Sequence, residues 1–444
     1  MRTLKRVALT AAAVLGAAVL ISCSAHGAQM PQSPLLKFFE RPAGLIVYIA
    51  PDGNVRVVDQ KGGGARALTS DAGAHPDGQV LYDAPTWAPD GRLVAYTRMT
   101  VNAASQVTDA SLFSSARDGT HATRLLSGSH LRPFYLYWSP DSRLVSLLSS
   151  VDPEGGLELG VAPAGVEGGY RALDRGSPFY WAWRGDSRAL VEHVNAGQPG
   201  QDGERLSVLN VGTEITRAVI KADPGVFQAP SFTADGKSVA YASTTAAVST
   251  LHLAAADGSG DRTVATERGG IFLAFSRDGR HLAYLAALRL QPVPLGTLNI
   301  VEVGAAAAKG TAAKRTLKED PVVEFFWSPD GRSLAFLTPD LGDTVDPMFA
   351  KNDSLAYVRL MGCDVASGRT WTIARFPPSR GFFNVLPFFD QYQRSSTIWS
   401  PDSRFLAFTA VTPDGTSAVF VSRADGNTQP RLLAPGDTAF WSPR

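Results

Sequence analysis

The residues best suited to bind or transform a ligand lie in one connection, residues 376–394, which reads FPPSRGFFNVLPFFDQYQR. It combines many aromatic side chains with a few charges, and binding hot spots favour aromatic residues and arginine. A solvent-exposed loop would not carry so many aromatic side chains, so they either pack over the fold as a lid or meet a partner. The candidate binding residues are Arg380, Phe388, Phe389, Asp390, Tyr392 and Arg394.

Sequence patterns for catalysis are missing. No serine has the flanking glycines of a nucleophile elbow, there is no H-E-x-x-H motif, and the seven histidines are scattered along the chain. We therefore assign no catalytic residue, no cofactor and no metal site. Glycan hydrolysis needs two carboxyl groups about 5–9.5 Å apart, which keeps a glycan hydrolase or lyase open as the alternative function. The carboxylates that could converge are Asp343, Asp346, Asp353 and Asp390.

A repeated unit must position these residues. Its clearest copy is WSPDGRSLAF, residues 327–336, in which an aromatic residue is followed by a tight turn and an alternating strand. The copies recur with a period of roughly 40 to 50 residues, which is typical of the blades of a β-propeller. Their aromatic residues are Trp87, Trp138, Trp183, Phe232, Phe275, Trp327, Trp399 and Trp441.

The turn of the repeat has its own chemistry. In Ser328-Pro329-Asp330-Gly331, proline and aspartate suit the second and third positions, and glycine supplies the left-handed conformation that closes the hairpin. Serine replaces this glycine at Ser142, Ser187 and Ser403, at a cost of about 1–2 kcal/mol that the surroundings must offset. One aspartate per turn, spread around a ring, does not converge on a single cation, so turn formation explains these residues.

The strands before the turns are apolar on both faces, as in residues 322–327, 134–138 and 179–183. Such strands are buried on both sides, as the inner strands between neighbouring blades would be. We therefore expect the repeated aromatic residues in the core between blades, where a tryptophan buries about 150–250 Å², and not as a stacking platform for a ligand.

The number and arrangement of the repeats predict an all-β fold, an eight-bladed propeller of four-stranded antiparallel blades, with seven blades as the alternative. The first strands, at 44–50, 54–60 and 65–69, form a blade without an inner strand, and residues 438–444 form an inner strand without a blade. The two ends of the chain complete each other, which removes exposed sheet edges. The propeller is predicted to span residues 44–444.

The W-S-P-D-G-[RK]-x-[IL]-A-[FY] unit resembles the repeat of TolB-type propellers and of the N-terminal propeller of dipeptidyl peptidase IV-like enzymes. The resemblance covers the chain from residue 44 to its end, and it implies a propeller. It does not extend to the peptidase half of those enzymes, because no long helical periodicity follows residue 24 and no segment is left for a hydrolase domain. The resemblance therefore implies binding more than peptidase activity.

The N-terminus has the pattern of an export signal. A basic start is followed by an apolar run at residues 7–21 that is too short for a membrane span. Leu20-Ile21-Ser22-Cys23 resembles the bacterial lipobox, which implies a signal peptide at 1–22, acylation of Cys23, for example with palmitate, and a lipidated tether at 23–43. An ordinary signal peptide with an incidental cysteine is the alternative. Ser24 follows the cysteine, where inner-membrane lipoproteins usually have aspartate, so the resemblance implies anchoring at the outer membrane or cell surface.

The long connections fall on one side of the predicted ring. They are residues 71–79, 195–204, 340–354 and 376–394, each joining the second and third strands of a blade or two successive blades. Binding residues concentrate on such loops. We therefore predict a non-catalytic, lipid-anchored, extracytoplasmic module, a monomer that binds an envelope protein, peptide or glycan on this side. The net charge of +1 gives no sign of nucleic-acid binding.

Overall fold

The computed structural model describes residues 43–444 except 77, 129, 198–202, 223, 226–227, 291–292, 304–313, 341–346 and 352–354. These residues belong to one compact unit, Pro42–Arg444. The predicted signal peptide, Cys23 and the tether up to residue 42 lie outside the described residues, as do Asp343, Asp346 and Asp353. Within the described part, no helix has the length and apolar character needed to cross a membrane.

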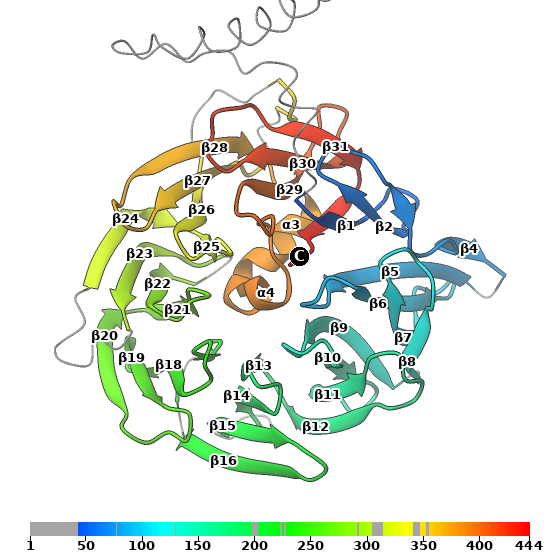
Figure 1. Ribbon diagram of the computed structural model, residues 1–444. Helices are drawn as coiled ribbons and strands as arrows, with labels where there is room; N and C mark the ends of the chain where they lie inside the picture. Colours follow the sequence, from blue (N-terminus) through cyan, green and yellow to red (C-terminus); the bar gives the residue numbers. More distant parts are fainter. Residues whose placement is uncertain are drawn as a thin grey trace, which may run out of the picture. The chain divides into compact units, whose positions relative to one another are not determined.

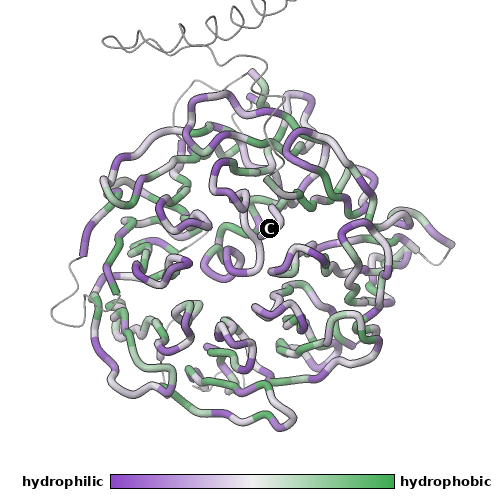
Figure 2. Tube along the Cα trace, viewed as in Figure 1, coloured by the Kyte–Doolittle hydropathy of each residue, from purple (hydrophilic) through white to green (hydrophobic). Residues whose placement is uncertain are grey.

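Eight antiparallel sheets surround a central channel and form the blades of a β-propeller (Figure 1). The predicted all-β fold with eight blades is confirmed, and the seven-bladed alternative is wrong. We number the blades in chain order from the one that contains the first strand. Figure 2 shows the hydrophobic stretches lying along the strands within the blades, whereas many of the turns at their ends are hydrophilic.

Blades 3 to 7 each contain four strands that run from the channel outwards in chain order. Blade 3 contains β9 (Leu131–Trp138), β10 (Leu144–Val151), β11 (Leu157–Pro163) and β12 (Arg171–Gly176). Blade 4 contains β13 (Phe179–Trp183), β14 (Ala189–Asn195), β15 (Glu204–Val211) and β16 (Ile215–Ala222). Blade 5 contains β17 (Ser231–Phe232), β18 (Ser238–Thr245), β19 (Val248–Ala255) and β20 (Arg262–Arg268). Blade 6 contains β21 (Gly270–Phe275), β22 (His281–Arg289), β23 (Leu295–Glu302) and β24 (Lys314–Val322). Blade 7 contains β25 (Glu324–Trp327), β26 (Ser333–Pro339), β27 (Val358–Asp364) and β28 (Thr370–Phe376).

The ring closes in blade 1, as predicted. Its strands, from the channel outwards, are β32 (Asp437–Trp441), β1 (Leu45–Ile49), β2 (Val55–Asp59) and β3 (Arg66–Ala67). The C-terminal strand β32 pairs antiparallel with β1, with Trp441 opposite Ile46 and Phe440 opposite Val47. Blade 2 contains β5 (Gly78–Trp87), β6 (Leu93–Val101), β7 (Val107–Ala116) and β8 (Thr123–Gly128). An additional short strand, β4 (Gly73–His75), pairs with the start of β5 and lies at the rim of the ring in Figure 1.

Blade 8 departs from the predicted pattern. It has three regular strands, β29 (Phe405–Val411), β30 (Ser417–Arg423) and β31 (Arg431–Pro435). Its inner strand is reduced to an isolated bridge between Trp399 and Leu406, and Thr397 pairs with Trp441 of the closing blade. A full inner strand was expected here; it is shortened because the chain reaches Thr397 directly from a helix.

The tight turns adopt the predicted left-handed conformation. Gly331 has φ +69°, and the serines that replace glycine, Ser142, Ser187 and Ser403, have φ +64°, +60° and +59°. Each serine hydroxyl accepts a hydrogen bond from the backbone N–H of the aspartate in the preceding blade's turn. The pairs are Ser142 with Asp90 at 3.1 Å, Ser187 with Asp141 at 2.9 Å and Ser403 with Asp330 at 3.1 Å. This bond between turns is the compensation that the strained serine requires.

The repeated aromatic residues lie in the cores between blades. Trp138, Trp399 and Trp441 are among the largest fully or nearly fully buried side chains, whereas Phe275 and Trp327 are half-buried. Most of the repeat tryptophans donate their indole N–H to the carbonyl that precedes the neighbouring blade's aromatic residue. These bonds are Trp87 to Phe440, Trp138 to Thr86, Trp183 to Tyr137, Trp327 to Ala274 and Trp399 to Phe326.

Candidate functional site

Residues 380–395 form a helical plug in the channel of the propeller. The plug consists of α3 (Arg380–Val385), the single-turn helix η2 (Leu386–Phe388) and α4 (Phe389–Ser395). Figure 1 shows α4 within the ring of inner strands. The sequence was interpreted as a loop here, which is wrong for these residues. The helices have only 6, 3 and 7 residues, too few to produce a recognisable helical periodicity.

The plug replaces a strand partner for the inner strand of blade 4. An inner strand is a sheet edge, and its N–H and C=O groups that face the channel have no neighbouring strand to pair with. The Gln391 side chain supplies both partners to Trp181: its Oε1 accepts from the backbone N–H at 3.2 Å, and its Nε2 donates to the carbonyl at 2.9 Å. The Tyr135 hydroxyl of blade 3 donates to the Gln391 carbonyl at 2.9 Å.

Two charged plug residues supply hydrogen-bond partners to the backbone of blade 5. The bonded residues directly precede its inner strand β17, which has only two residues. Asp390 Oδ2 accepts from the backbone N–H of Ala229 at 3.0 Å. The Arg394 guanidinium donates to the carbonyls of Pro230 and Ala229, and to that of Leu273 in blade 6. Burial raises the pKa of Asp390, against the opposing effects of the Ala229 N–H and Arg394, and burial lowers the pKa of Arg394.

Aromatic contacts hold the rest of α4. Phe389 is fully buried between Phe272 and Phe325, with ring centroids 5.7 Å and 5.2 Å away. Tyr392 meets the Tyr135 ring edge-on at 4.7 Å. The candidate residues Phe389, Asp390, Tyr392 and Arg394 are thus brought together inside the channel, where their contacts fasten the plug.

The other two candidate residues, Arg380 and Phe388, lie on the exposed side of the plug. Phe388 in η2 is 46 % exposed, and Phe383 in the preceding helix α3 is 37 % exposed. Phe134, on the inner strand of blade 3, is 42 % exposed and lines a cavity of 110 Å³ together with Asn384 and Val385 of the plug. We call this side of the channel the plug face.

Two aspartates that the sequence interpretation missed stand beside this cavity. Asp83 lines it with an exposed side chain, and partial desolvation by the surrounding channel wall, together with the charge of Asp437, raises the pKa of Asp83. Asp437 accepts hydrogen bonds from the Ser379 hydroxyl and the Gly381 N–H at the start of α3. The signal was present: DAPTW at 83–87 and DTAFW at 437–441 place an aspartate at the same spacing before the repeat tryptophan of adjacent blades. The residue after each, Ala84 and Thr438, has φ +52°.

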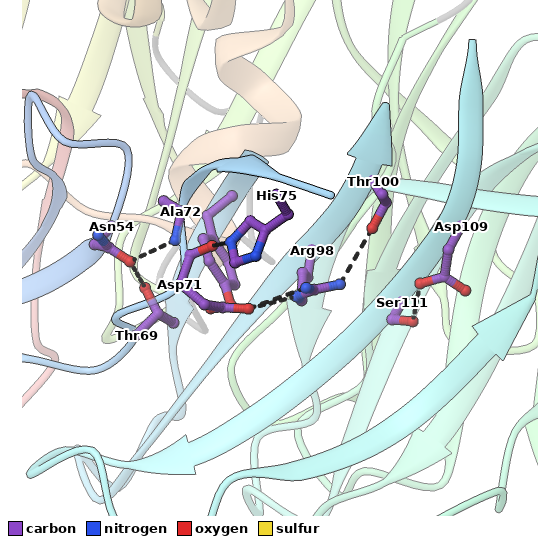
Figure 3. A network of polar contacts seen from close by, with 10 residues as sticks. Asn54, Thr69, Asp71, Ala72, His75, Arg98, Thr100, Asp109 and Ser111 are labelled. Carbon is purple, nitrogen blue, oxygen red and sulfur yellow. Dashed lines mark hydrogen bonds and ion pairs between the residues drawn. The ribbon is translucent and has the colours of Figure 1, made fainter. Parts of the chain in front are cut away.

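The connection before blade 2 carries a polar network (Figure 3). The Asp71 carboxylate accepts from Tyr82 and from Arg98, whose Nη2 lies 3.0 Å away. Asn54 Oδ1 accepts from the Thr69 hydroxyl at 3.0 Å and from a neighbouring backbone N–H. Figure 3 shows Arg98 between Asp71 and Thr100. These charges are paired with one another, so the network fastens the connection to blades 1 and 2.

A hydrogen-bonded Ser–His–Asp set lies in blade 5. Ser243 Oγ lies 2.8 Å from His252 Nε2, and His252 Nδ1 lies 3.0 Å from the Asp261 carboxylate. Tyr241 stacks on the His252 ring at 4.7 Å and also donates to Asp261. The three residues connect β18, β19 and the turn that follows, and they do not line the 110 Å³ cavity beside the plug. We therefore assign the set to the fold and not to a hydrolytic site.

Among the described residues, no group of three or more His, Cys, Asp or Glu side chains is placed to hold a metal ion. The aspartates of the repeats act within their own turns. In the turn of blade 7, Asp330 Oδ1 accepts from the Ser328 hydroxyl at 2.6 Å and from the Arg332 N–H at 3.0 Å.

Comparisons with known proteins place the chain in the β-propeller class and go no further. No protein-family model and no curated protein matches it. A solved structure described as the eukaryotic initiation factor is 12% identical, with a TM-score of 0.50 over 91% of this chain and 99% of that one. An oligogalacturonate lyase in complex with manganese is 18% identical, with a TM-score of 0.48 over 85% and 95%. TolB from Acinetobacter baumannii is 15% identical, with a TM-score of 0.40 over 82% and 83%. Such likenesses show the fold alone.

Proposed function

We propose that the protein is a non-catalytic binding module outside the cytoplasm, anchored to a bacterial membrane through a lipid on Cys23, and that it binds an envelope protein or peptide on the plug face. The observation that carries this proposal is that three aromatic side chains of the plug and of the inner strand β9 are exposed: Phe383, Phe388 and Phe134. Exposed aromatic residues are enriched where proteins meet partners.

The plug presents these side chains from a fixed support. Its inner side is held by the Gln391, Asp390 and Arg394 bonds to the inner strands, and Phe389 is packed between two blades. A surface that is already ordered loses less conformational freedom on binding, which favours affinity. The same contacts explain why the aromatic residues of this segment divide into a buried and an exposed set.

The chemistry of the plug face favours a peptide segment with an apolar and a basic side chain. The 110 Å³ cavity beside Phe134 has room for a small apolar side chain. The carboxyl group of Asp83 lines it, and Asp437 is near enough to act on Asp83 through its charge, so this part of the wall is acidic. Opposite charges across an interface set its specificity and its association rate.

Site-specific crosslinking tests this proposal. A photo-reactive phenylalanine analogue at position 388, introduced in the native host, should give a discrete protein adduct. The same analogue at Val166, which is 50 % exposed on the connection between the outer strands of blade 3, should give none. Phe388→Ser should abolish the adduct formed from position 383 and leave the melting temperature unchanged. Equal adducts from 166 and 388, or binding of a purified glycan that Phe388→Ser abolishes, would contradict a protein partner.

Membrane fractionation tests the anchor. Cys23→Ala should move the protein from the membrane fraction to the soluble fraction without altering its melting temperature, and it should abolish metabolic labelling with palmitate. Cys363→Ser is the matched control, because Cys363 is fully buried in the fold and should have no part in partitioning. A Cys23→Ala protein that remains with the membranes refutes the lipid anchor.

The alternative, a glycan hydrolase or lyase at the channel mouth, has weaker support. Asp390 is 1 % exposed and hydrogen-bonded to Ala229, so its carboxylate is turned to the fold and not to a substrate. We therefore keep the binding module as the proposed function.

A further inference from the structure

The channel is open on the side of the tight turns, opposite the plug face, and holds a cavity of 380 Å³ there. We call it the axial cavity. The C-terminal end of α4 borders it, and its walls are repeat aromatics, among them Trp87, Trp327, Trp399 and Trp441, with the turns that follow them. Pockets for small organic molecules measure about 300–1,000 Å³ and are lined largely by apolar and aromatic side chains. The axial cavity fits this description.

The charged side chains of the axial cavity all have one sign. Among its described lining residues, the charged ones are Arg277 and Arg394, and none is Asp or Glu. Asp390, the carboxyl group whose charge acts on Arg394, is buried behind the wall, is bonded to Ala229 and does not line the cavity. A concave site with aromatic walls and charge of one sign concentrates ligands of the opposite charge. The cavity therefore favours an anion.

Arg394 is fixed in an orientation before any ligand arrives. It donates to the backbone carbonyls of Ala229, Pro230 and Leu273. A guanidinium has five N–H donors, so donors remain for a ligand oxygen after these three bonds. The carbonyls of Gln391 and Tyr392 at the end of α4 are occupied, by the Tyr135 hydroxyl and by the N–H of Ser396.

Two further donors of the cavity lining have no acceptor. The indole N–H of Trp441, a residue 1 % exposed, is buried without a hydrogen-bond partner among the described residues, and so is the Nε2 of Gln393. The tryptophans of blades 2, 3, 4, 7 and 8 all donate to a carbonyl, so Trp441 is an exception to a repeated arrangement. Buried donors in proteins are nearly always paired. Both nitrogen atoms are closed to solvent, so they mark an irregularity of the cavity wall and are not contact points for a ligand.

We propose that the axial cavity binds a small carboxylate attached to a flat apolar ring. The aromatic walls would contact the ring, and Arg277 and Arg394 would receive the carboxylate oxygens. This site lies on the opposite side of the channel from the plug face, so it is independent of the protein partner proposed above. The same chemistry occurs in a free aromatic acid and in the C-terminal residue of a peptide that ends in phenylalanine.

Calorimetric titration of the purified protein tests the ligand class. The probes are naphthoate, its neutral analogue naphthamide, and Gly-Gly-Phe with a free or an amidated C-terminus. Each acid that binds should bind about tenfold more tightly than its amide, because charge-assisted hydrogen bonds are the stronger ones. Binding of naphthoate alone identifies a free acid as the source, and binding of the tripeptide alone identifies a peptide end. Equal binding of acids and amides, or no binding of either acid, overturns the proposal.

Two variants of one turn test the place. Arg277→Gln should weaken binding of the acid about tenfold, as expected for loss of a charged partner. Arg280→Gln is the matched control: Arg280 is exposed in the same turn, lies 3.7 Å from Asp278, and does not line the axial cavity. Equal weakening by both variants would indicate a general effect of charge and overturn the site.

Discussion

Blades 3 and 8 contain the same turn and different inner strands. Both read WSPDSR, at residues 138–143 and 399–404, and both turns carry a left-handed serine bonded to the preceding blade. Before the turn, blade 3 has the eight-residue strand β9, whereas blade 8 has only the bridge between Trp399 and Leu406. The repeat thus determines the turn and the strand after it, and leaves the strand before it free to vary.

In blade 8, the segment before the turn forms part of the plug. The chain that would have formed the start of the eighth inner strand instead forms α4 in the channel, and its polar side chains bond to the backbones of blades 4, 5 and 6. In blade 5 it bonds to Ala229 and Pro230, which directly precede the two-residue inner strand β17. One irregular blade therefore supplies hydrogen-bond partners to others and supports an ordered plug face.

Removal of the closing strand should have the largest effect. Deletion of residues 436–444 removes β32, and with it the burial of Phe440 and Trp441, each worth about 3–5 kcal/mol. That sum is comparable to the stability of a typical domain, about 5–15 kcal/mol. We expect loss of the cooperative thermal transition measured by calorimetry. Deletion of residues 443–444 alone leaves β32 intact and should retain the transition. An unchanged melting temperature after the longer deletion would show that the ring does not depend on its C-terminus.

The plug gives the next largest effect. Gln391→Ala leaves both the N–H and the carbonyl of Trp181 without their plug partner, and a buried unpaired polar group costs about 1–3 kcal/mol. We expect a loss of about 2 kcal/mol in chemical denaturation. Asn384→Ala, an exposed position on α3, should change stability by less than about 0.5 kcal/mol. Equal effects of the two substitutions would show that α4 does not bear on the stability of blade 4.

The sequence predicted the features that depend on local chemistry. The period of the repeat predicted eight blades, and proline, aspartate and glycine predicted the turn and the strain at Ser142. The plug was missed because its partners are distant in sequence: Gln391 bonds to Trp181 across 210 residues, and no local pattern records such a contact. The aromatic residues of 376–394 indicated a special segment, and the choice between lid and partner needed the burial of each side chain, which differs between Phe388 and Phe389.

Blades 3 and 7 each bury a glutamate, and the two carboxyl groups differ in whether they have a partner. In blade 3, Glu158 is paired with Arg175 at 2.6 Å. In blade 7, Glu324 is fully buried without a hydrogen-bond partner among the described residues, and burial raises its pKa well above the ordinary value. The folded protein then keeps a proton that the unfolded chain releases above about pH 4.3, so this group lowers stability as pH rises.

Glu324→Gln removes that dependence. The stability of the Glu324→Gln variant relative to the wild type should therefore increase from pH 5 to pH 8. The measurement is the free energy of unfolding of both proteins at each of the two pH values. Glu158→Gln should instead be destabilising at both, because it breaks an ion pair in a nearly buried position. If the advantage of Glu324→Gln does not grow with pH, Glu324 is ionised in the folded protein and has a partner.

The smallest effects should come from the shared turn. At Ser142 and at Ser403, substitution by alanine removes the hydroxyl that accepts the neighbouring turn's N–H and keeps the left-handed strain. A lost hydrogen bond costs about 0.5–1.5 kcal/mol. Substitution by glycine removes the same bond but also relieves a strain of about 1–2 kcal/mol, so the two terms nearly cancel. At each site, the alanine variant of the protein should therefore be less stable than the glycine variant by about 1 kcal/mol. The same difference in blades 3 and 8 would show that the turn is independent of the inner strand, and a difference confined to one blade would show that the strand before the turn alters it.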